Sequence, residues 1–208
     1  MASLFVFDMA RNREFDEQKV IETATELFWT KGYNAVSTQD LIDAFGISRS
    51  SMYGAYKDKR SLFLLALQHY RQTASQSMLD ILGKNISFID TITLILNQII
   101  KETITDIKSK GCFVVNTAIE LAPHDKEILD IIQENRKNII IGLTQAIQKG
   151  IDNNELSVNN DPKALANYFY NLINGLRVDA KVTKDKQNYK ETIRLALTVL
   201  QTDKKGSR

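Results

Sequence analysis

A short stretch of hydroxyl and basic side chains carries the chemistry that nucleic-acid recognition needs. Arg49, Ser50, Ser51 and Gly54 fall within one short predicted helix. Arginine donates a bidentate pair of hydrogen bonds to guanine, and serine hydroxyls bond to bases or phosphates. Because the outer side of this helix is polar and short, we expect these four residues to face base edges.

A second set of side chains suits the phosphate backbone. Tyr53 can reach a phosphate through its hydroxyl. Lys57, Lys59 and Arg60 follow at the start of the next predicted helix, where positive charge and free backbone N–H groups favour phosphate. The charge is local, since 27 basic and 25 acidic residues leave the whole chain at only +2. This balance excludes a generally basic nucleic-acid coat and favours selective docking.

Local signals place these residues on a helix-turn-helix. Ser37 is a predicted N-cap with Asp40 as its returning acidic partner, and Gly46 can end the first helix in the left-handed conformation. A second helix then begins at Ser48. In such a motif the second helix enters the major groove. The alternative is a helical hairpin within an ordinary all-α core, with its lysines solvated.

The segment 46–63, GISRSSMYGAYKDKRSLF, resembles the signature of tetracycline-repressor (TetR) family regulators, G-V-S-x-G-x-[LI]-Y-x-[HY]-F-x-[SN]-K-[ED]-x-L. The matching positions are Gly46, Ile47, Ser48, Tyr53, Lys59, Leu62 and Phe63. The preceding run from Ile21 to Thr38 is similar to the family pattern as well, without a gap. The main departures are Tyr56 in place of the usual phenylalanine and Arg60 in place of an acidic residue.

The resemblance implies roles for individual residues. Thr38, Tyr53 and Lys59 match the family's contacts to backbone phosphates, and the four base-reading candidates occupy its recognition positions. It implies a ligand-responsive transcriptional regulator, most simply a repressor. The expected partners are a palindromic double-stranded DNA operator, a second copy of the chain and a small-molecule effector that releases the DNA. The alternative is a helical ligand-binding or protein-interaction module that no longer reads specific DNA.

Composition predicts an all-α fold of about nine helices, with a three-helix DNA-binding head and a larger helical body. The chain has two prolines and nine glycines in 208 residues. We expect an N-terminal arm at 1–13, the helix-turn-helix domain at 14–60, a ligand-binding and dimerisation domain at 61–202, and a flexible tail at 203–208. No apolar run approaches the roughly 20 residues of a membrane span, so we expect a cytoplasmic protein that inserts in no membrane.

Hydrophobic periodicity places long helices in the body. The predicted ranges are 59–82, 88–108, a short helix from Gly111 to Pro123, 125–150, 162–181 and 189–201.

The middle helices are expected to enclose the effector. Buried polar groups are costly unless paired, so polar residues within apolar runs indicate a ligand or a structural bond. The candidates are Phe88, Phe113, Asn116, Thr117, Glu120, Phe169 and Tyr170. For Asn116 and Glu120, a hydrogen bond between neighbouring helices is the alternative.

The last two long helices are the predicted dimer interface. Each is apolar over more than the one stripe that its own core needs. The candidates are Leu165, Tyr168, Leu172, Gly175, Leu176, Ile193, Leu197 and Leu200. Two such helices per subunit can form a four-helix interface about a twofold axis, as in TetR-type regulators. The alternative is a helix pair used entirely inside the monomer.

Catalytic and metal-binding patterns are absent from the sequence. It has no Gly-rich phosphate loop, paired carboxylates or nucleophile with a nearby histidine, so we expect neither an enzyme nor a cofactor. Cys112 with His69 and His124 is a poor metal set, and a buried apolar role suits this single cysteine better. A lone cysteine also fits a reducing compartment.

The first residues do not form a secretory signal, because no basic segment precedes the apolar run and Asp8 interrupts it. Residues 1–8 are therefore interpreted as an upstream start or an added extension, with packing on the body or a neighbouring chain as the alternative. Arg11 and Arg13 would form an arm for phosphates or a minor groove, or a frayed tail.

Overall fold

The computed structural model describes residues 15–157 and 161–200, and every regular element in those ranges is a helix. The expectations for the N-terminal arm and the C-terminal tail lie outside the described residues. None of the helices in the described ranges combines the length and apolar character that a membrane crossing requires.

The head consists of α1 (Glu17–Lys31), α2 (Thr38–Phe45) and α3 (Arg49–Tyr56). The predicted capping box is present, because Ser37 Oγ accepts from the Asp40 N–H and the Asp40 carboxylate accepts from the Ser37 N–H. Gly46 has a φ of 65°, which a residue with a Cβ adopts at a cost. The turn therefore follows the local rules that predicted it.

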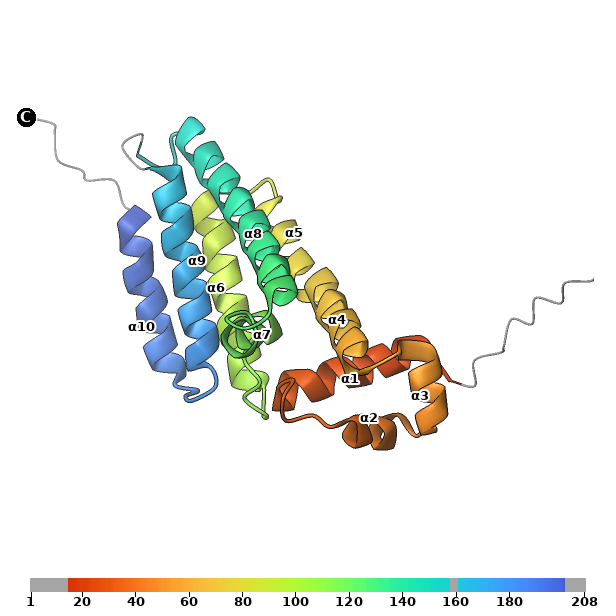
Figure 1. Cartoon of the computed structure of the whole chain (residues 1–208). Coiled ribbons are helices and arrows are strands. Elements are labelled where there is room, and N and C mark those ends of the chain that lie inside the picture. The colour runs from red at the N-terminus through yellow and green to blue at the C-terminus, as the bar shows by residue number, and fades with distance from the viewer. Residues whose placement is uncertain (1–14, 158–160, 201–208) are drawn as a thin grey trace, which may run out of the picture.

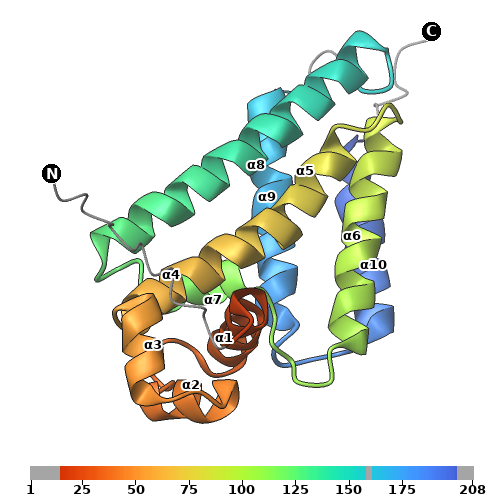
Figure 2. The ribbon, with the colours of Figure 1, turned by 90° about the vertical axis from the view of Figure 1, so that its right-hand side faces the viewer.

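One continuous helix connects the head to the body. It is built from α4 (Lys59–Tyr70), a π-helical turn (Arg71–Ser75) and α5 (Gln76–Leu82), which together fill the predicted range 59–82. Figure 2 shows this rod running from the head along the body towards the start of α6. The π turn was not predicted, and such turns are frequent at functional sites.

The body is a bundle of helices beyond the head (Figure 1). Its members are α6 (Phe88–Thr105), α7 (Phe113–Glu120), α8 (Lys126–Asp152), α9 (Pro162–Asp179) and α10 (Lys186–Leu197), the last followed by a 3₁₀ turn (Thr198–Leu200). Counting α4 to α5 as one rod, the described residues form nine continuous helices, as predicted. Helix α6 ends earlier than expected because Asp106 leaves the helical conformation, and α10 begins earlier because Asp185 caps it.

Two clusters of buried residues form the core. The larger lies in the body, and the other joins the head helices to the connecting rod. Phe113 and Val114 of α7 belong to the head-side cluster, and the Phe113 ring packs edge to face on Phe63, with centroids 5.6 Å apart. Helix α7 therefore fastens the body to the head.

Candidate nucleic-acid interface and the cavity behind it

Helix α3 separates an apolar inner face from a polar outer face. Met52 and Tyr56 are buried. Arg49 and Gly54 are exposed, and so is Tyr53, at 44%. The outer face therefore offers side chains that can touch a partner without disturbing the core.

The first turn of α3 is held by exposed, uncharged partners. Arg49 donates from Nη2 to Gln39 Oε1 on α2 over 2.7 Å. The Ser48 hydroxyl caps the helix by accepting from the Ser51 N–H at 3.0 Å, and it lies 2.9 Å from the Ser50 hydroxyl. Exposed hydrogen bonds of this kind exchange readily for bonds to base edges, because water competes with them and a neutral pair contributes only about 1 kcal/mol net.

Two further phosphate candidates lie at helix ends. Thr38 is the first residue of α2 and is partly exposed. Lys57 follows the last residue of α3, is exposed and has a φ of 62°. Neither residue belongs to the clusters of buried residues that form the core.

Lys59 differs from the other phosphate candidates. Its ammonium donates to the carbonyls of Tyr33 at 3.0 Å and Val36 at 2.9 Å, and it lies 4.2 Å from the centre of the Tyr33 ring. Two of its three donors are thus committed to the loop between α1 and α2. In this state of the molecule Lys59 therefore holds that loop in place, and the predicted phosphate contact would have to be made by its remaining donor or in exchange for one of these bonds.

Arg60, which follows Lys59, is also bound within the protein. Its guanidinium forms two hydrogen bonds with the Asp125 carboxylate and one with Glu127, at 2.6 Å. The bonds from Arg60 outweigh burial and lower the pKa of Asp125. Arg60 therefore ties the start of the connecting rod to the start of α8.

Glu120 makes a second link between body and head. Its carboxylate accepts from the backbone N–H of Tyr33 at 3.0 Å and of Asn34 at 2.8 Å. Gly32 lies beneath it with a φ of 85°, and a Cβ at that position would be 2.9 Å from Glu120 Oε2. These contacts support the structural alternative for Glu120, a hydrogen bond that holds neighbouring parts of the fold together, over a contact with an effector.

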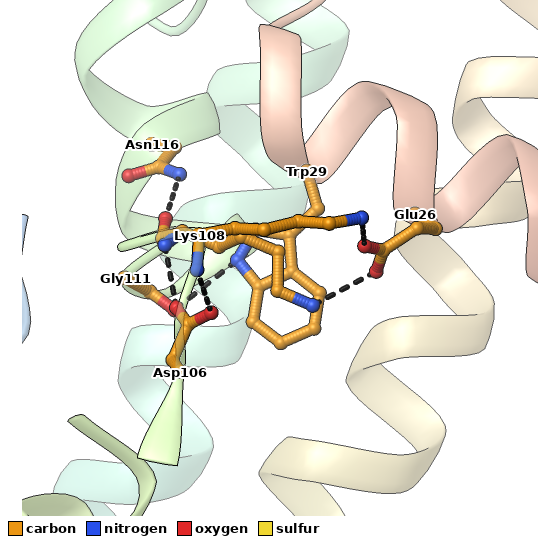
Figure 3. A network of polar contacts seen from close by, with 7 residues as sticks. Glu26, Trp29, Asp106, Lys108, Gly111 and Asn116 are labelled. Carbon is orange, nitrogen blue, oxygen red and sulfur yellow. Dashed lines mark hydrogen bonds and ion pairs between the residues drawn. The ribbon is translucent and has the colours of Figure 1, made fainter. Parts of the chain in front are cut away.

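The loop between α6 and α7 makes a third link, at α1 (Figure 3). Glu26 accepts from Lys108 and from Lys110, each at 2.8 Å. The Lys110 ammonium also lies 3.9 Å from the centre of the Trp29 ring, and Trp29 donates from Nε1 to the Gly111 carbonyl at 3.1 Å. Burial acts to raise the pKa of Glu26, but the two lysines outweigh it and keep that pKa low.

Further bonds shape this loop. Asn116 donates to the Lys110 carbonyl at 2.8 Å, and the Asp106 carboxylate accepts from the Lys108 N–H at 3.1 Å. Gly111 has a φ of 68°, and an added Cβ would lie 3.0 Å from the Arg177 carbonyl. The loop is thus wedged between α9 and the head.

A cavity of about 760 Å³ opens between α1, the connecting rod, α6, this loop and α9. Its volume suits a drug-sized molecule. The lining residues are Thr25, Glu26, Trp29, His69, Tyr70, Thr73, Ala74, Ser77, Met78, Ile81, Ile95, Gln98, Ile99, Glu102, Thr103, Thr105, Asp106, Ile107, Lys108, Lys110, Gly111, Cys112, Arg177 and Ala180. The π turn supplies Thr73 and Ala74, so it helps to shape the cavity wall.

Residues of the head form part of this wall. Trp29 of α1 faces Tyr70 of the connecting rod, with ring centroids 4.9 Å apart. Tyr70 is buried, and burial is the main reason why its pKa is raised. A molecule in the cavity would therefore touch the head and the body at once.

None of the seven predicted effector residues lines this cavity. Phe88 and Phe169 pair in the body core, with centroids 5.8 Å apart. Phe113 and Thr117 are buried, Asn116 and Glu120 make the bonds described above, and Tyr170 lies beneath Arg136. Sequence reasoning missed Trp29 and Arg177, because they belong to helices assigned to DNA binding and dimerisation.

The predicted dimer residues divide into two groups. Leu176, Ile193 and Leu200 are buried in the body core of the single chain, as the alternative of a helix pair used inside the monomer expects for these three. Leu165, Leu172 and Leu197 are partly buried against the same core, and Tyr168 and Gly175 are exposed. The large apolar residues that remain exposed on α9, α10 and the 3₁₀ turn after α10 are Tyr168, Val178, Leu195 and Val199.

Cys112 is buried, at 4% exposure, and borders the cavity. Over residues 15–157 and 161–200, no three histidine, cysteine or acidic side chains gather as a metal site would require.

Comparison with known proteins matches both parts of the chain. Residues 20–66 match a family model for bacterial regulatory proteins of the tetR family, and residues 92–196 match one for a tetracyclin repressor-like C-terminal domain. The uncharacterized HTH-type transcriptional regulator YezE of Bacillus subtilis is 32% identical over 193 residues, which cover 92% of this chain and 100% of YezE. The HTH-type transcriptional repressor ComR of Escherichia coli is 24% identical over 176 residues, 82% of each chain.

Solved structures of other regulators have the same overall fold. The TetR family transcriptional regulator CifR, in a complex with a 26-base-pair operator, has a TM-score of 0.82 and 26% identity over 92% of this chain and 100% of CifR. The reduced form of E. coli NemR has a TM-score of 0.79 at 17% identity, over 90% of this chain and 97% of NemR, and it shows the fold alone.

Proposed function

Because this chain belongs to the TetR family of bacterial transcriptional regulators, we propose that it represses genes as a homodimer that a small molecule releases from a palindromic operator. The observation that carries the proposal is the shared wall of the cavity. Trp29 on head helix α1 lines the same 760 Å³ space as the body helices. An effector there contacts the element that orients the helix-turn-helix.

Release requires that the effector bind one head orientation more tightly than another, and nothing more. Two recognition helices must lie about one DNA turn, roughly 34 Å, apart to read a palindrome. A small tilt of each head is enough to spoil that spacing. The loop that binds Glu26 and Trp29 is the element through which a filled cavity would change the tilt.

On the DNA side, Arg49, Ser50, Ser51 and Gly54 are assigned to base edges, and Thr38, Tyr53 and Lys57 to phosphates. This assignment rests on the exposed outer face of α3 and on the likeness to CifR, whose structure contains operator DNA. The division at residue 60 between a DNA-binding and a ligand-binding domain is a functional one, since Phe113 and Val114 of body helix α7 pack into the head-side cluster.

The dimer is assigned to α9 and α10 because exposed apolar side chains remain there after the monomer core is complete. The relatives found are transcriptional regulators, and we assign no catalytic role to the chain. A DNA-reading regulator of a bacterium acts in the cytoplasm, which is the location we propose.

The experiment is selection of bound duplexes from a random library, followed by salt titration of the winning sequence. A palindrome should emerge, with log affinity falling by about 0.9 per neutralised phosphate for each unit of log salt. Arg49→Ala should relax the preference at one base position, whereas Lys57→Ala should weaken all sequences alike and reduce the slope by about 1 per subunit.

Lys163→Ala is the matched control, because Lys163 is exposed at the start of α9, remote from the head (Figure 1). If folded, dimeric protein enriches no sequence, or if Arg49→Ala and Lys57→Ala behave like Lys163→Ala, the DNA-reading assignment fails. The chain would then be a ligand-binding or protein-interaction module.

A further inference from the structure

The charged side chains around the cavity differ in depth. Lys110 is only 16% exposed at its side chain, and Arg177 of α9 is partly buried. The carboxylates lie nearer the rim, since Glu26 is 41% exposed at its side chain and Glu102 is an exposed residue. Because Lys110 is paired with Glu26, Arg177 supplies the positive charge that is left without an ion pair in the inner part of the cavity.

The carboxylates already have partners. Glu26 is shared by two lysines, as described above. Glu102 accepts from the Gln98 side-chain amide at 2.8 Å, and Asp106 accepts from backbone N–H groups of its own loop. These groups have less capacity left for a cationic ligand.

Arg177 has no such partner. Within residues 15–157 and 161–200, its guanidinium forms no hydrogen bond and no ion pair. It lines the cavity together with Cys112, Tyr70 and Glu102. A guanidinium removed from bulk water is costly unless an anion compensates it. Five donors in a planar fork match a carboxylate, sulfonate or phosphate.

The rest of the cavity suits an apolar body. Met78, Ile81, Ile95 and Ile99 are buried and line it, and Trp29 supplies an aromatic surface. A small inorganic anion that only paired with Arg177 would leave this apolar surface uncovered.

We propose that the cavity takes a small amphipathic anion, an organic acid whose acidic group pairs with Arg177 and whose apolar body lies against α5 and α6. The proposal rests on the effector role assigned above, and it adds the chemical class of the effector. Arg177 sets the preference for an anion, and the isoleucines set the preference for an apolar chain or ring.

The test uses two dyes with the same aromatic body. 1-Anilinonaphthalene-8-sulfonate carries an anion, and N-phenyl-1-naphthylamine lacks it. Both brighten when they leave water. Trp29 is the single tryptophan of the chain, so energy transfer from its indole reports dye bound beside it. Decanoate and 1-decanol, used as competitors, repeat the comparison with a carboxylate.

Three variants locate the effect. Arg177→Gln removes the charge, and Arg177→Lys replaces the fork by a point charge. Ser77→Phe narrows the cavity without changing charge. Arg136→Gln is the control, because Arg136 lies outside the cavity, where it donates to Asn167 and covers the Tyr170 ring.

We expect the wild-type protein to bind the sulfonate dye at least about tenfold more tightly than the neutral dye. Arg177→Gln should weaken the sulfonate dye by on the order of 10- to 100-fold and change the neutral dye less than about twofold. Arg177→Lys should fall between, and it carries the test if Arg177→Gln does not fold by circular dichroism. Ser77→Phe should weaken both dyes, and Arg136→Gln neither.

Equal affinity of the wild-type protein for both dyes overturns the proposal. So does an Arg177 variant that folds and keeps the full preference for the anion, or dye binding that survives Ser77→Phe. Duplex selection with the same protein keeps the two conclusions separate. An operator without anion preference refutes only the ligand class, and anion preference without an operator refutes only the regulator function.

Discussion

Replacing Gly32 by alanine should damage the link between head and body. Gly32 has φ 85° and ψ 165°, a region that is essentially restricted to glycine. The added methyl carbon would also lie 2.9 Å from Glu120 Oε2. The carboxylate cannot retreat without losing its bonds to the N–H groups of Tyr33 and Asn34.

The magnitude follows from these two effects. Backbone strain in this region costs about 1–3 kcal/mol. Displacing the half-exposed Glu120 carboxylate from two N–H groups adds roughly 1–2 kcal/mol, because bonds to a charged group are worth about 1.5–3 kcal/mol when well buried. We therefore expect Gly32→Ala to lower the free energy of unfolding by about 2–5 kcal/mol.

A double-mutant cycle with Glu120→Ala separates the two effects. In the Glu120→Ala background the clash is gone and only the backbone strain remains. The sum of the two single-mutant costs should therefore exceed the double-mutant cost by about 1–2 kcal/mol. The assay is urea unfolding at fixed protein concentration, since the stability of the proposed dimer would depend on concentration.

Gly54→Ala is the matched control, because Gly54 is inside α3 with open space where the Cβ would go. It should be neutral or stabilising by up to about 1 kcal/mol. The reasoning is refuted if Gly32→Ala costs less than about 0.5 kcal/mol, or if its cost is the same with and without Glu120.

Three further predictions concern other parts of the molecule. Lys59→Met should lower thermal stability as well as DNA affinity, because it leaves two loop carbonyls without their donor; an unchanged melting temperature would contradict the loop-holding role. The hydrogen bonds from Ser37 lower the pKa of Asp40 to about 2. The stability that the ionised Asp40 contributes is therefore complete above its unfolded pKa near 4 and is lost as the pH falls from about 4 to about 2. Urea unfolding should show a smaller loss of stability over that pH range in Asp40→Asn than in the wild-type protein, and equal losses would argue against the capping box. Tyr168→Glu and Leu195→Lys, at exposed positions of α9 and α10, should each yield monomers in sedimentation experiments and weaken operator binding; intact dimers in both variants would move the interface elsewhere.

The helix-turn-helix was predictable because its determinants are local. Ser37 and Asp40 are three residues apart, and Gly46 and Ser48 act on the chain directly beside them. Such contacts form whatever the rest of the fold does, so the residue types in order were sufficient. The family signature pointed to the same segment for the same reason, since it is a continuous run.

The helices of the body were predictable in number and approximate extent, but their partners were not. Apolar periodicity shows that a helix has a face to bury, without showing whether its own chain or a second one covers it. Leu176 and Ile193 lie in the monomer core, whereas Leu195 remains exposed. The assignment of core against interface had to wait for the packed bundle.

The sequence by itself determined the family, the class of fold and the segment that reads DNA, because local capping and a continuous motif specify them. Only the tertiary structure decided the cavity and the links between head and body. Trp29, Tyr70, Cys112 and Arg177 come from distant parts of the chain, and Glu120 bonds to N–H groups 86 and 87 residues before it. Which side chains meet across such separations depends on how whole helices pack, and no local pattern contains that information.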